Sequence, residues 1–337
     1  MTFSFKPLRE QVIVITGASS GIGLATAREA ARQGARLALV SRNESVLKQI
    51  AAEIAESGGE AIPIVADVGQ RADLQRAADI VQERFGGFDT WVNNAGVSVY
   101  GRLEEVRDED HLRLFLTNFW GTVFGSLVAL PVLRRRGGAL INIGSEASDH
   151  ALPLQGMYSA SKHAVKGFTD ALRMELILEK APVSVTLIKP AGIDTPYTTH
   201  ARNYLDEEPA VPPPVYAPEE VAHAILHAAT HAKRDIHVGG SSRVMHTLAR
   251  VAPGALDHVG APLVAKLQTR DAPAQPRPDS LHVSHAAGRV RGDYPGRVMR
   301  RSLYTRTSLH PGLTGALVLG LGVVAYTLAH RRGAPTG

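Results

Sequence analysis

Three residues of the sequence could together transfer a proton: Ser145, Tyr158 and Lys162. If the residues from position 157 onward are helical, Tyr158 and Lys162 lie one turn apart and project from the same face. A phenol has a pKa of about 10, and a cation fixed beside it favours the phenolate and lowers that pKa. Ser145 follows residues 139–143, an apolar run that predicts a buried parallel strand with its chemistry at the carboxyl end. A Tyr and a Lys at this spacing also occur on many helices by chance.

Further motifs accompany this set in a fixed order. They are Thr-Gly-Ala-Ser-Ser-Gly-Ile-Gly at 16–23, Asn-Asn-Ala-Gly at 93–96, Asn118, and Pro-Ala-Gly-Ile-Asp-Thr at 190–195. In order and spacing, over about residues 10–240, the motifs resemble the short-chain dehydrogenase/reductase family. The resemblance implies four catalytic residues, namely Asn118, Ser145, Tyr158 and Lys162. Asn118 would hold a water that links Lys162 to solvent, although an Asn within a helix more often bonds to its local backbone.

The elements that must position these groups begin with a strand, a turn and a helix. Residues 11–16 read as an apolar strand and residues 24–33 as a helix. Between them, Gly17, Gly21 and Gly23 allow a tight turn whose N–H groups and helix N-terminus face a pyrophosphate. The alternative is an ordinary βα turn, because a glycine triplet alone is weak evidence.

The end of the second strand, residues 36–41, indicates which coenzyme binds. An acidic residue there would bind the ribose 2′-hydroxyl of NAD. This chain instead has Ser41 followed by Arg42, which removes a negative charge and offers a cation to a 2′-phosphate. The sequence therefore favours NADP (NADPH) over NAD. The alternative is that Arg42 caps or solvates the following helix.

The resemblance places the remaining coenzyme contacts on loops after the other strands. Asp67 and Val68 would contact the edge of the adenine, and residues 190–195 would contact the nicotinamide carboxamide. In that second motif this chain has Ala191 where the family usually has Gly. The full set of coenzyme-binding residues that it implies is Gly17, Ser19, Ser20, Gly21, Ile22, Gly23, Ser41, Arg42, Asp67, Val68, Asn94, Ala95, Gly96, Tyr158, Lys162, Pro190, Ile193 and Thr195. The side chains of the asparagines at 93 and 94 could equally tie neighbouring strands together.

Apolar strands that alternate with amphipathic helices predict an α/β fold. We expect a Rossmann-like, doubly wound parallel sheet of about seven strands in a single domain with a C-terminal extension. Within the catalytic domain, residues 1–241, the irregular segment 196–214 reads as a substrate lid. Beyond it we expect a helical extension with a Pro-rich linker at 242–280, a basic juxtamembrane segment at 281–310 and a transmembrane helix at 311–330.

Composition and charge argue against several classes of site and partner. The chain has no cysteine, which excludes disulfides, and its first residues contain no apolar segment typical of a signal peptide. The net charge of +5 comes from the C-terminal part, because residues 281–310 hold six arginines and one aspartate. We therefore expect no nucleic acid partner and a cytoplasmic catalytic domain. His223, His227 and His231 recur at every fourth position, but an exposed stripe explains them and we expect no metal.

The last apolar run, residues 313–329, carries no charge over seventeen positions. As a helix it would be about 26 Å long, at the short end for crossing a bilayer. The arginines on both sides, slightly in excess before the run, favour a membrane anchor with the catalytic domain in the cytoplasm. Gly312, Ala316 and Gly320 would let two such helices pair, and we expect a homo-oligomer. A helix packed on the enzyme's own apolar surface or on a partner subunit is the alternative.

Together these features predict an oxidoreductase that interconverts a carbonyl and a secondary alcohol with NADP(H). In the implied mechanism the coenzyme carries the hydride, Ser145 and Tyr158 bond to the substrate oxygen, and Lys162 lowers the Tyr158 pKa. Leu152, Leu154, Met157 and the tyrosine-bearing lid suggest an apolar pocket. A membrane tail would suit a lipophilic small molecule, such as a steroid, a retinoid or a lipid-derived ketone. The alternative is a non-catalytic dinucleotide-binding sensor or membrane scaffold, although such proteins typically lose the Tyr or the Lys.

Overall fold

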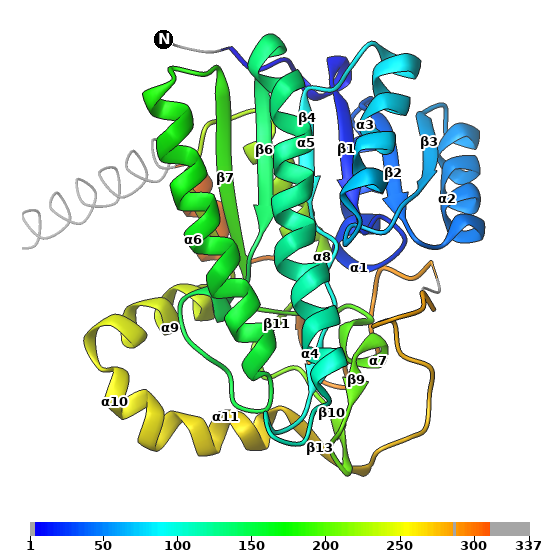
Figure 1. The fold of residues 1–337 in the computed structure, drawn as a ribbon. Coiled ribbons are helices and arrows are strands. Elements are labelled where there is room, and N and C mark those ends of the chain that lie inside the picture. The colour runs from blue at the N-terminus through cyan, green and yellow to red at the C-terminus, as the bar shows by residue number, and fades with distance from the viewer. Residues whose placement is uncertain (1–3, 286–287, 311–337) are drawn as a thin grey trace, which may run out of the picture.

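One parallel sheet forms the centre of the molecule (Figure 1). The structure, a computed structural model, describes residues 4–285 and 288–310. Seven strands lie in the order β12-β7-β6-β4-β1-β2-β3, and every neighbouring pair is parallel. They are β1 (Val12–Thr16), β2 (Arg36–Ser41), β3 (Glu60–Val65), β4 (Thr90–Asn93), β6 (Gly138–Ile143), β7 (Val183–Pro190) and β12 (Asp235–Val238). The predicted Rossmann-like, doubly wound sheet of about seven strands is confirmed.

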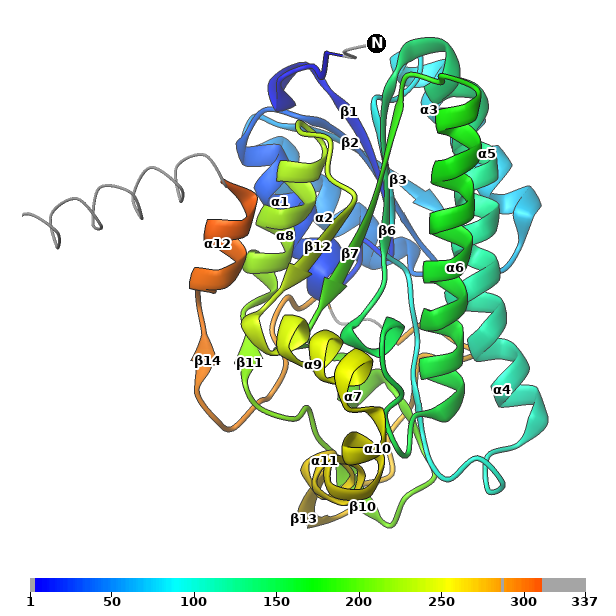
Figure 2. The same ribbon diagram turned by 90° about the vertical axis from the view of Figure 1, so that its left-hand side faces the viewer.

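Helices cover both faces of this sheet, as Figures 1 and 2 show. One face packs against α1 (Gly21–Arg32), α2 (Glu44–Glu56) and α8 (Pro218–Ala228), and the other against α3 (Arg71–Phe85), α5 (Gly121–Arg136) and α6 (Gly156–Leu178). α4 (Asp108–Phe115) and the short π-helix η2 (Leu116–Trp120) run directly into α5. Apolar residues such as Leu47, Ile50 and Ile54 recur along one side of a helix and are buried there. Every residue of β1 and β6 is buried, because both of their faces are covered.

The order of the strands reverses between β1 and β4, which are neighbours at the centre of the sheet. From β1 the chain builds β2 and β3 on one side, and from β4 it builds β6, β7 and β12 on the other. In such sheets a crevice opens outside the carboxyl ends of the strands where the strand order reverses. The loops that follow β1 and β4 carry the predicted glycine-rich turn and the predicted residues 94–96, so both border this crevice.

The C-terminal extension packs on the domain and is not a free linker. After α9 (Gly240–Val251), α10 (Pro253–Ala255), η4 (Leu256–Gly260) and α11 (Ala261–Leu267), the chain forms β13 (Thr269–Pro273), β14 (Val298–Met299) and α12 (Leu303–Leu309). β13 pairs antiparallel with β10 (Glu207–Pro209), and β14 pairs parallel with β11 (Val215–Tyr216), which in turn pairs with β8 (Gly192–Ile193). The lid expected at 196–214 also contains α7 (Tyr197–His200) and β9 (Arg202–Asn203), and β9 pairs with β5 (Val99–Tyr100). The expected linker and the expected irregular lid are therefore corrected: both contain short regular elements held by pairing to distant parts of the chain.

Within the described residues, one helical stretch, Asp108–Arg136, is long and apolar enough to cross a membrane. About two thirds of its most apolar window is buried in the protein (67%), so it is a core helix of this fold. The apolar run that the sequence assigns to a membrane anchor, 313–329, lies outside the described residues. α12, the last described element, lies beside α8 (Figure 2).

Candidate active site

Most of the predicted site residues line one cavity, which is bordered by the loops that follow β1, β4, β6 and β7. Its volume is ≈ 270 Å³. It is lined by every predicted coenzyme-binding residue except Gly23, and by three of the four predicted catalytic residues: Ser145, Tyr158 and Lys162. Asn118, the fourth, does not line it. The structure therefore brings together predicted site residues that lie up to 178 positions apart in the sequence, from Gly17 to Thr195.

The glycine-rich turn after β1 is tied to the loop after β4. Thr16 Oγ1 accepts hydrogen bonds from the N–H groups of Asn94 (2.9 Å) and Ala95 (3.1 Å), and the Asn94 amide donates to the carbonyl oxygen of Thr16 (2.9 Å). The asparagine thus ties neighbouring strands, the structural role that the sequence left open. Gly17 has a φ of +67°, and a Cβ on Gly23 would lie 2.2 Å from the carbonyl oxygen of Gly17. Neither position accepts a larger residue without displacement of the turn.

The start of α1 contributes to the same cavity. Ser19, Ser20, Gly21 and Ile22 line it, which fits the predicted role of this helix N-terminus in holding phosphate. One donor is already used, because the N–H of Gly21 donates to the carbonyl oxygen of Arg289 at 2.9 Å. That contact with the C-terminal extension could not be foreseen from the motif.

Ser145, Tyr158 and Lys162 lie together as the spacing predicts. Tyr158 is in the first turn of α6, and Lys162 is one turn later. Ser145 Oγ accepts a backbone N–H of the short helix η3 (Glu146–Ser148) at 3.1 Å and bonds to the Tyr158 hydroxyl. Lys162 Nζ donates to the carbonyl oxygen of Ile143 at 2.9 Å and lies 5.7 Å from the centre of the Tyr158 ring. Ser145 and Lys162 are buried, while Tyr158 is partly exposed.

Burial is the main influence on the ionisation of these groups. It raises the pKa of Tyr158, and hydrogen bonds from Ser145 and Tyr197 oppose that change. Burial also lowers the pKa of Lys162 to about 8, so the ammonium group stays mostly protonated at neutral pH. Desolvation of the phenolate makes the net change of the Tyr158 pKa upward, and the lowering of that pKa by Lys162 stays a prediction.

Asn118 lies on η2, and such π-helical turns are frequent at functional sites. Its Oδ1 accepts from the N–H of Val97 at 2.8 Å, and its Nδ2 donates to the Val97 carbonyl oxygen at 3.0 Å and to Ser161 Oγ at 3.2 Å. The fully buried side chain thus fixes the loop after β4 to α6. Its role as the holder of a water next to Lys162 stays a prediction.

The end of β2 brings Ser41 and Arg42 to the cavity with Asp67. The Asp67 carboxylate pairs with Arg113 at 2.6 Å. The Arg42 guanidinium donates to backbone carbonyl oxygens of residues 280–282 in the extension. The alternative that Arg42 caps the next helix is wrong, because the side chain of Asn43 is the N-cap of α2.

Sequence reasoning missed a polar cluster beside Tyr158. Tyr197 donates from its hydroxyl to Gln155 Oε1 at 2.8 Å and also bonds to Tyr158, and Ser98 donates to the same Gln155 oxygen at 3.1 Å. Glu146 also lines the cavity, and burial raises its pKa to about 7. No motif marks these residues individually. Tyr197 belongs to the expected lid, and Glu146 and Gln155 lie in the stretch from Ser145 to Lys162.

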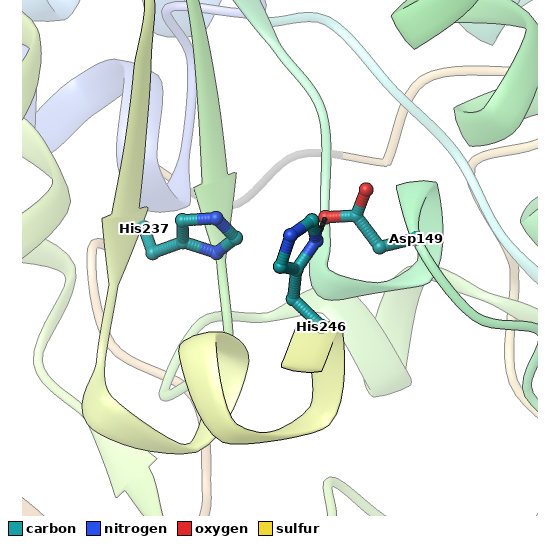
Figure 3. Close-up of side chains that lie close together, drawn as sticks. All are labelled: Asp149, His237 and His246. Carbon is teal, nitrogen blue, oxygen red and sulfur yellow. Dashed lines mark ion pairs between the residues drawn. The ribbon is translucent and has the colours of Figure 1, made fainter. Parts of the chain in front are cut away.

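A second group of side chains has the spacing of a metal site. Among the described residues, Asp149, His237 and His246 bring ligand atoms within 4.8 Å of one another (Figure 3). Lys189 Nζ lies 2.9 Å from the same Asp149 oxygen that pairs with His246, and Lys166 Nζ lies 2.5 Å from the other oxygen. Two ammonium groups already neutralise this carboxylate and would repel a metal cation. The group fits a buried ion-pair network, and we assign no metal to it.

The histidine stripe is only partly exposed. His227 is buried, in contrast to the expectation, because α8 packs against both α1 and α12. Its ring stacks on that of His231 with 4.2 Å between centroids. Burial lowers the pKa of His227 to about 4, so this side chain is neutral at physiological pH.

Comparison with known proteins identifies the family. The family model described as short chain dehydrogenase matches residues 11–205. YxnA, an uncharacterised oxidoreductase of Bacillus subtilis, is 45% identical over 330 residues, which cover 97% of this chain and 92% of YxnA. 11-beta-hydroxysteroid dehydrogenase A of Sesamum indicum is 37% identical over 190 residues, 56% of this chain and 54% of that protein.

Solved structures share the fold and hold nicotinamide coenzymes. An alcohol dehydrogenase from the archaeon Thermococcus sibiricus, in complex with 5-hydroxy-NADP, is 29% identical with a TM-score of 0.60 and covers 67% of this chain and 95% of its own. A short chain dehydrogenase/reductase from Burkholderia phymatum, in complex with NAD, is 25% identical with a TM-score of 0.65 and covers 82% of this chain and 100% of its own. The two neighbours carry different coenzymes, so they support a nicotinamide dinucleotide without a choice between NAD and NADP. With a family match over more than half of its length and a relative 45% identical along nearly all of it, the chain belongs to the short chain dehydrogenase family of oxidoreductases that act on alcohols and carbonyls.

Proposed function

We propose that this oxidoreductase interconverts a lipophilic carbonyl compound and its secondary alcohol with NADP(H), in a cytoplasmic domain anchored to a membrane. The observation that carries the proposal is the grouping of Ser145, Tyr158 and Lys162 at a cavity that the glycine-rich turn also lines. A phenol and a hydroxyl beside a dinucleotide-binding turn suit proton transfer at a carbonyl oxygen.

In the direction of reduction, the coenzyme supplies the hydride when it is bound. Ser145 and Tyr158 would donate hydrogen bonds to the substrate oxygen and stabilise the negative charge that develops there. The Tyr158 hydroxyl would pass its proton to that oxygen, and the raised pKa of this phenol keeps the proton in place at neutral pH. Lys162, with a pKa of about 8, remains charged and would stabilise the phenolate left behind.

The charges at the end of β2 support NADP over NAD. Ser41 is buried and neutral, so nothing there repels a 2′-phosphate. The charged groups at this end of the cavity are two guanidinium groups, those of Arg42 and Arg113, and one carboxylate, that of Asp67. The excess positive charge favours a coenzyme with an additional phosphate.

Apolar residues support a lipophilic substrate. Val97, Leu152 and Ile193 line the cavity, whereas Leu154 and Met157, which the sequence also pointed to, do not. The similarity to a hydroxysteroid dehydrogenase makes steroids the first class to test. The uncharged run 313–329 with arginines on both sides supports a membrane anchor, and pairing of such helices would give a homo-oligomer.

A coenzyme-oxidation screen tests this function. Full-length protein in detergent is mixed with NADPH or NADH and with steroid, retinoid, aliphatic and aromatic carbonyls, and the loss of the reduced coenzyme is followed. We expect turnover with at least one lipophilic carbonyl, and a higher kcat/KM with NADPH than with NADH. Tight coenzyme binding without turnover on any carbonyl would favour the alternative, a dinucleotide-binding sensor.

A further inference from the structure

The C-terminal extension fixes the arginine that the proposed coenzyme preference depends on. Arg42 Nη1 donates to the carbonyl oxygens of Leu281 (3.2 Å) and His282 (3.1 Å), and its Nη2 donates to that of Ser280 (2.5 Å). Three consecutive backbone carbonyls, more than 230 positions further along the chain, therefore hold one guanidinium group. Such a contact orders a side chain that would otherwise sample many rotamers.

The segment that supplies these carbonyls, residues 279–284, is itself firmly anchored. The Leu281 side chain is fully buried in a cluster with Val97 and Leu114. Its carbonyl oxygen also accepts from Arg113 Nε at 3.1 Å. On one side of it, the Asp279 carboxylate accepts from Arg202 at 2.9 Å and from the N–H of Leu281 at 2.9 Å.

The same segment forms part of the cavity wall. Ser280 and Ser284 line the cavity that Ser41 and Arg42 also line. A guanidinium group has five N–H donors in a planar fork. Among the described residues, these three hydrogen bonds leave the Nε–H and one Nη2–H of Arg42 without an acceptor. The Nε and Nη2 atoms lie on the same side of the planar fork, and two donors on one side can bind a phosphate through two parallel hydrogen bonds.

We propose that residues 279–284 complete the coenzyme site at its adenosine end, by orienting Arg42 so that its free edge binds the 2′-phosphate. This inference rests on the proposed preference for NADP and extends it to residues outside the part of the chain that the family model matches. Asp279 and Leu281 are positioning residues, because they act on the phosphate only through Arg42. Their removal lowers affinity for the 2′-phosphate and leaves the remainder of the adenosine contact in place.

Two nucleotides that differ only in the 2′-phosphate test this directly. The dissociation constants of adenosine 2′,5′-bisphosphate and adenosine 5′-monophosphate are measured by calorimetry on the full-length protein. We compare wild type with Asp279→Ala and Leu281→Ala, and use Asp271→Ala as the control, since Asp271 is exposed in the same extension and its side chain makes no hydrogen bond or ion pair with the described residues. Thermal unfolding of each variant establishes that it is folded.

Wild type should bind the bisphosphate more tightly than the monophosphate. In Asp279→Ala and Leu281→Ala, the Kd of the bisphosphate should rise by about tenfold, while that of the monophosphate changes by less than about twofold. The control variant should match wild type for both nucleotides. If folded Asp279→Ala and Leu281→Ala keep the wild-type ratio of the two constants, the inference is wrong and the NADP preference stands. If wild type itself does not distinguish the nucleotides, the proposed NADP preference is wrong, and the inference has no basis.

Discussion

At the scale of single residues, burial controls how the groups around Tyr158 ionise. It raises the pKa of Tyr158, raises that of Glu146 to about 7 and lowers that of Lys162 to about 8. Each shift disfavours the charged form, as expected where water is displaced. Below pH about 7 these groups are therefore mostly neutral, apart from Lys162. A carboxyl group that titrates near neutral pH beside the Tyr158 phenol should give the site a pH dependence of its own.

Glu146→Gln should shift the pH profile of alcohol oxidation. Oxidation needs Tyr158 to accept a proton, and the Glu146 carboxylate, which forms above pH about 7, raises the Tyr158 pKa by repulsion. Without that charge, the pH of half-maximal kcat should fall by roughly half a unit. The exposed Glu104→Gln serves as the control and should leave the profile unchanged.

The same substitution has a consequence for stability. In the folded protein the pKa of Glu146 is raised from 4.5 to about 7, so the folded state favours the protonated carboxyl group. The contribution of this group to the free energy of unfolding is therefore fully present below pH 4.5 and is lost as the pH rises through 7. Glu146→Gln should therefore gain stability relative to wild type between pH 5 and pH 8, measured by chemical unfolding. A pH-independent difference in stability and an unshifted kcat profile would show that Glu146 does not titrate in this range.

Ser41→Asp should reverse the coenzyme preference. A carboxylate at the end of β2 would lie against a 2′-phosphate and could instead accept a hydrogen bond from a ribose hydroxyl. The ratio of kcat/KM for NADPH to that for NADH should fall by on the order of 10²-fold, since like charges in contact cost several kcal/mol. Ser41→Asn has nearly the same shape without the charge and should change the ratio far less. Equal use of both coenzymes by wild type would contradict our reading of Arg42.

The site residues that could be predicted from the sequence are those whose positions follow from local spacing or backbone geometry. Tyr158 and Lys162 are related by one helical turn, and the glycine-rich turn by backbone geometry, so both could be placed without a structure. Glu146, Gln155 and Tyr197 could not, because their importance comes only from where the fold brings them. The direction of the Tyr158 pKa shift also depends on burial, which spacing does not reveal.

At the scale of elements, the loop that carries Ser145 is fixed by a buried ion-pair network. Asp149, just beyond η3, pairs with Lys166 on α6, with Lys189 on β7 and with His246 on α9. Burial alone would raise the Asp149 pKa, but the hydrogen bonds of the two lysines outweigh it and hold the pKa well below its usual range. Three elements thus converge on the end of the loop that places the Ser145 hydroxyl.

Asp149→Asn should destabilise the protein strongly. It would leave Lys189, whose side chain is only 3% exposed, without its nearest negative charge, a loss of roughly 3–5 kcal/mol in unfolding free energy. The effect should be full above pH 3.8 and shrink as the pH falls, because the folded pKa of Asp149 is depressed. Glu179→Gln, which breaks the exposed pair with Arg134, should cost no more than about 1 kcal/mol. Equal losses for the two variants, measured by denaturant unfolding, would contradict this account of the loop.

The strands of the central sheet could be predicted from the sequence, whereas those of the C-terminal extension could not. Strand β2 was predicted with its observed bounds, and β1 and β6 were predicted to within one residue, because an apolar run identifies a strand that is buried on both faces. β13 and β14 are short and largely exposed, so they have no such pattern. Their existence depends on pairing with β10 and β11, which only the folded chain brings near.

At the scale of the whole molecule, the extension joins the coenzyme site to the predicted membrane anchor. It contacts Arg42 through residues 280–282, and it ends in α12, whose Leu309 is buried in the core. The apolar run 313–329 begins only a few residues later. An anchor at this position would hold the catalytic domain close to the bilayer surface, where lipophilic substrates concentrate.

Removal of residues 311–337 should release the protein from membranes. This cut keeps α12 and its core contacts, so the truncated domain should fold and remain active. Full-length protein should sediment with membranes and need detergent for extraction, whereas the truncated protein should stay in the soluble fraction. If the full-length protein is soluble without detergent and the cut changes nothing, the anchor does not exist.

The central claim is that Tyr158 transfers the proton in an NADP(H)-dependent reaction, and one substitution tests it most directly. Tyr158→Phe removes only the hydroxyl, and Tyr304→Phe makes the same change on α12, where the ring does not line the candidate cavity. Turnover with the best carbonyl is measured together with the Kd for NADPH. Tyr158→Phe should lose at least about 10²-fold in kcat while the Kd stays nearly unchanged, and Tyr304→Phe should behave as wild type. Turnover of Tyr158→Phe close to that of wild type would contradict the central claim.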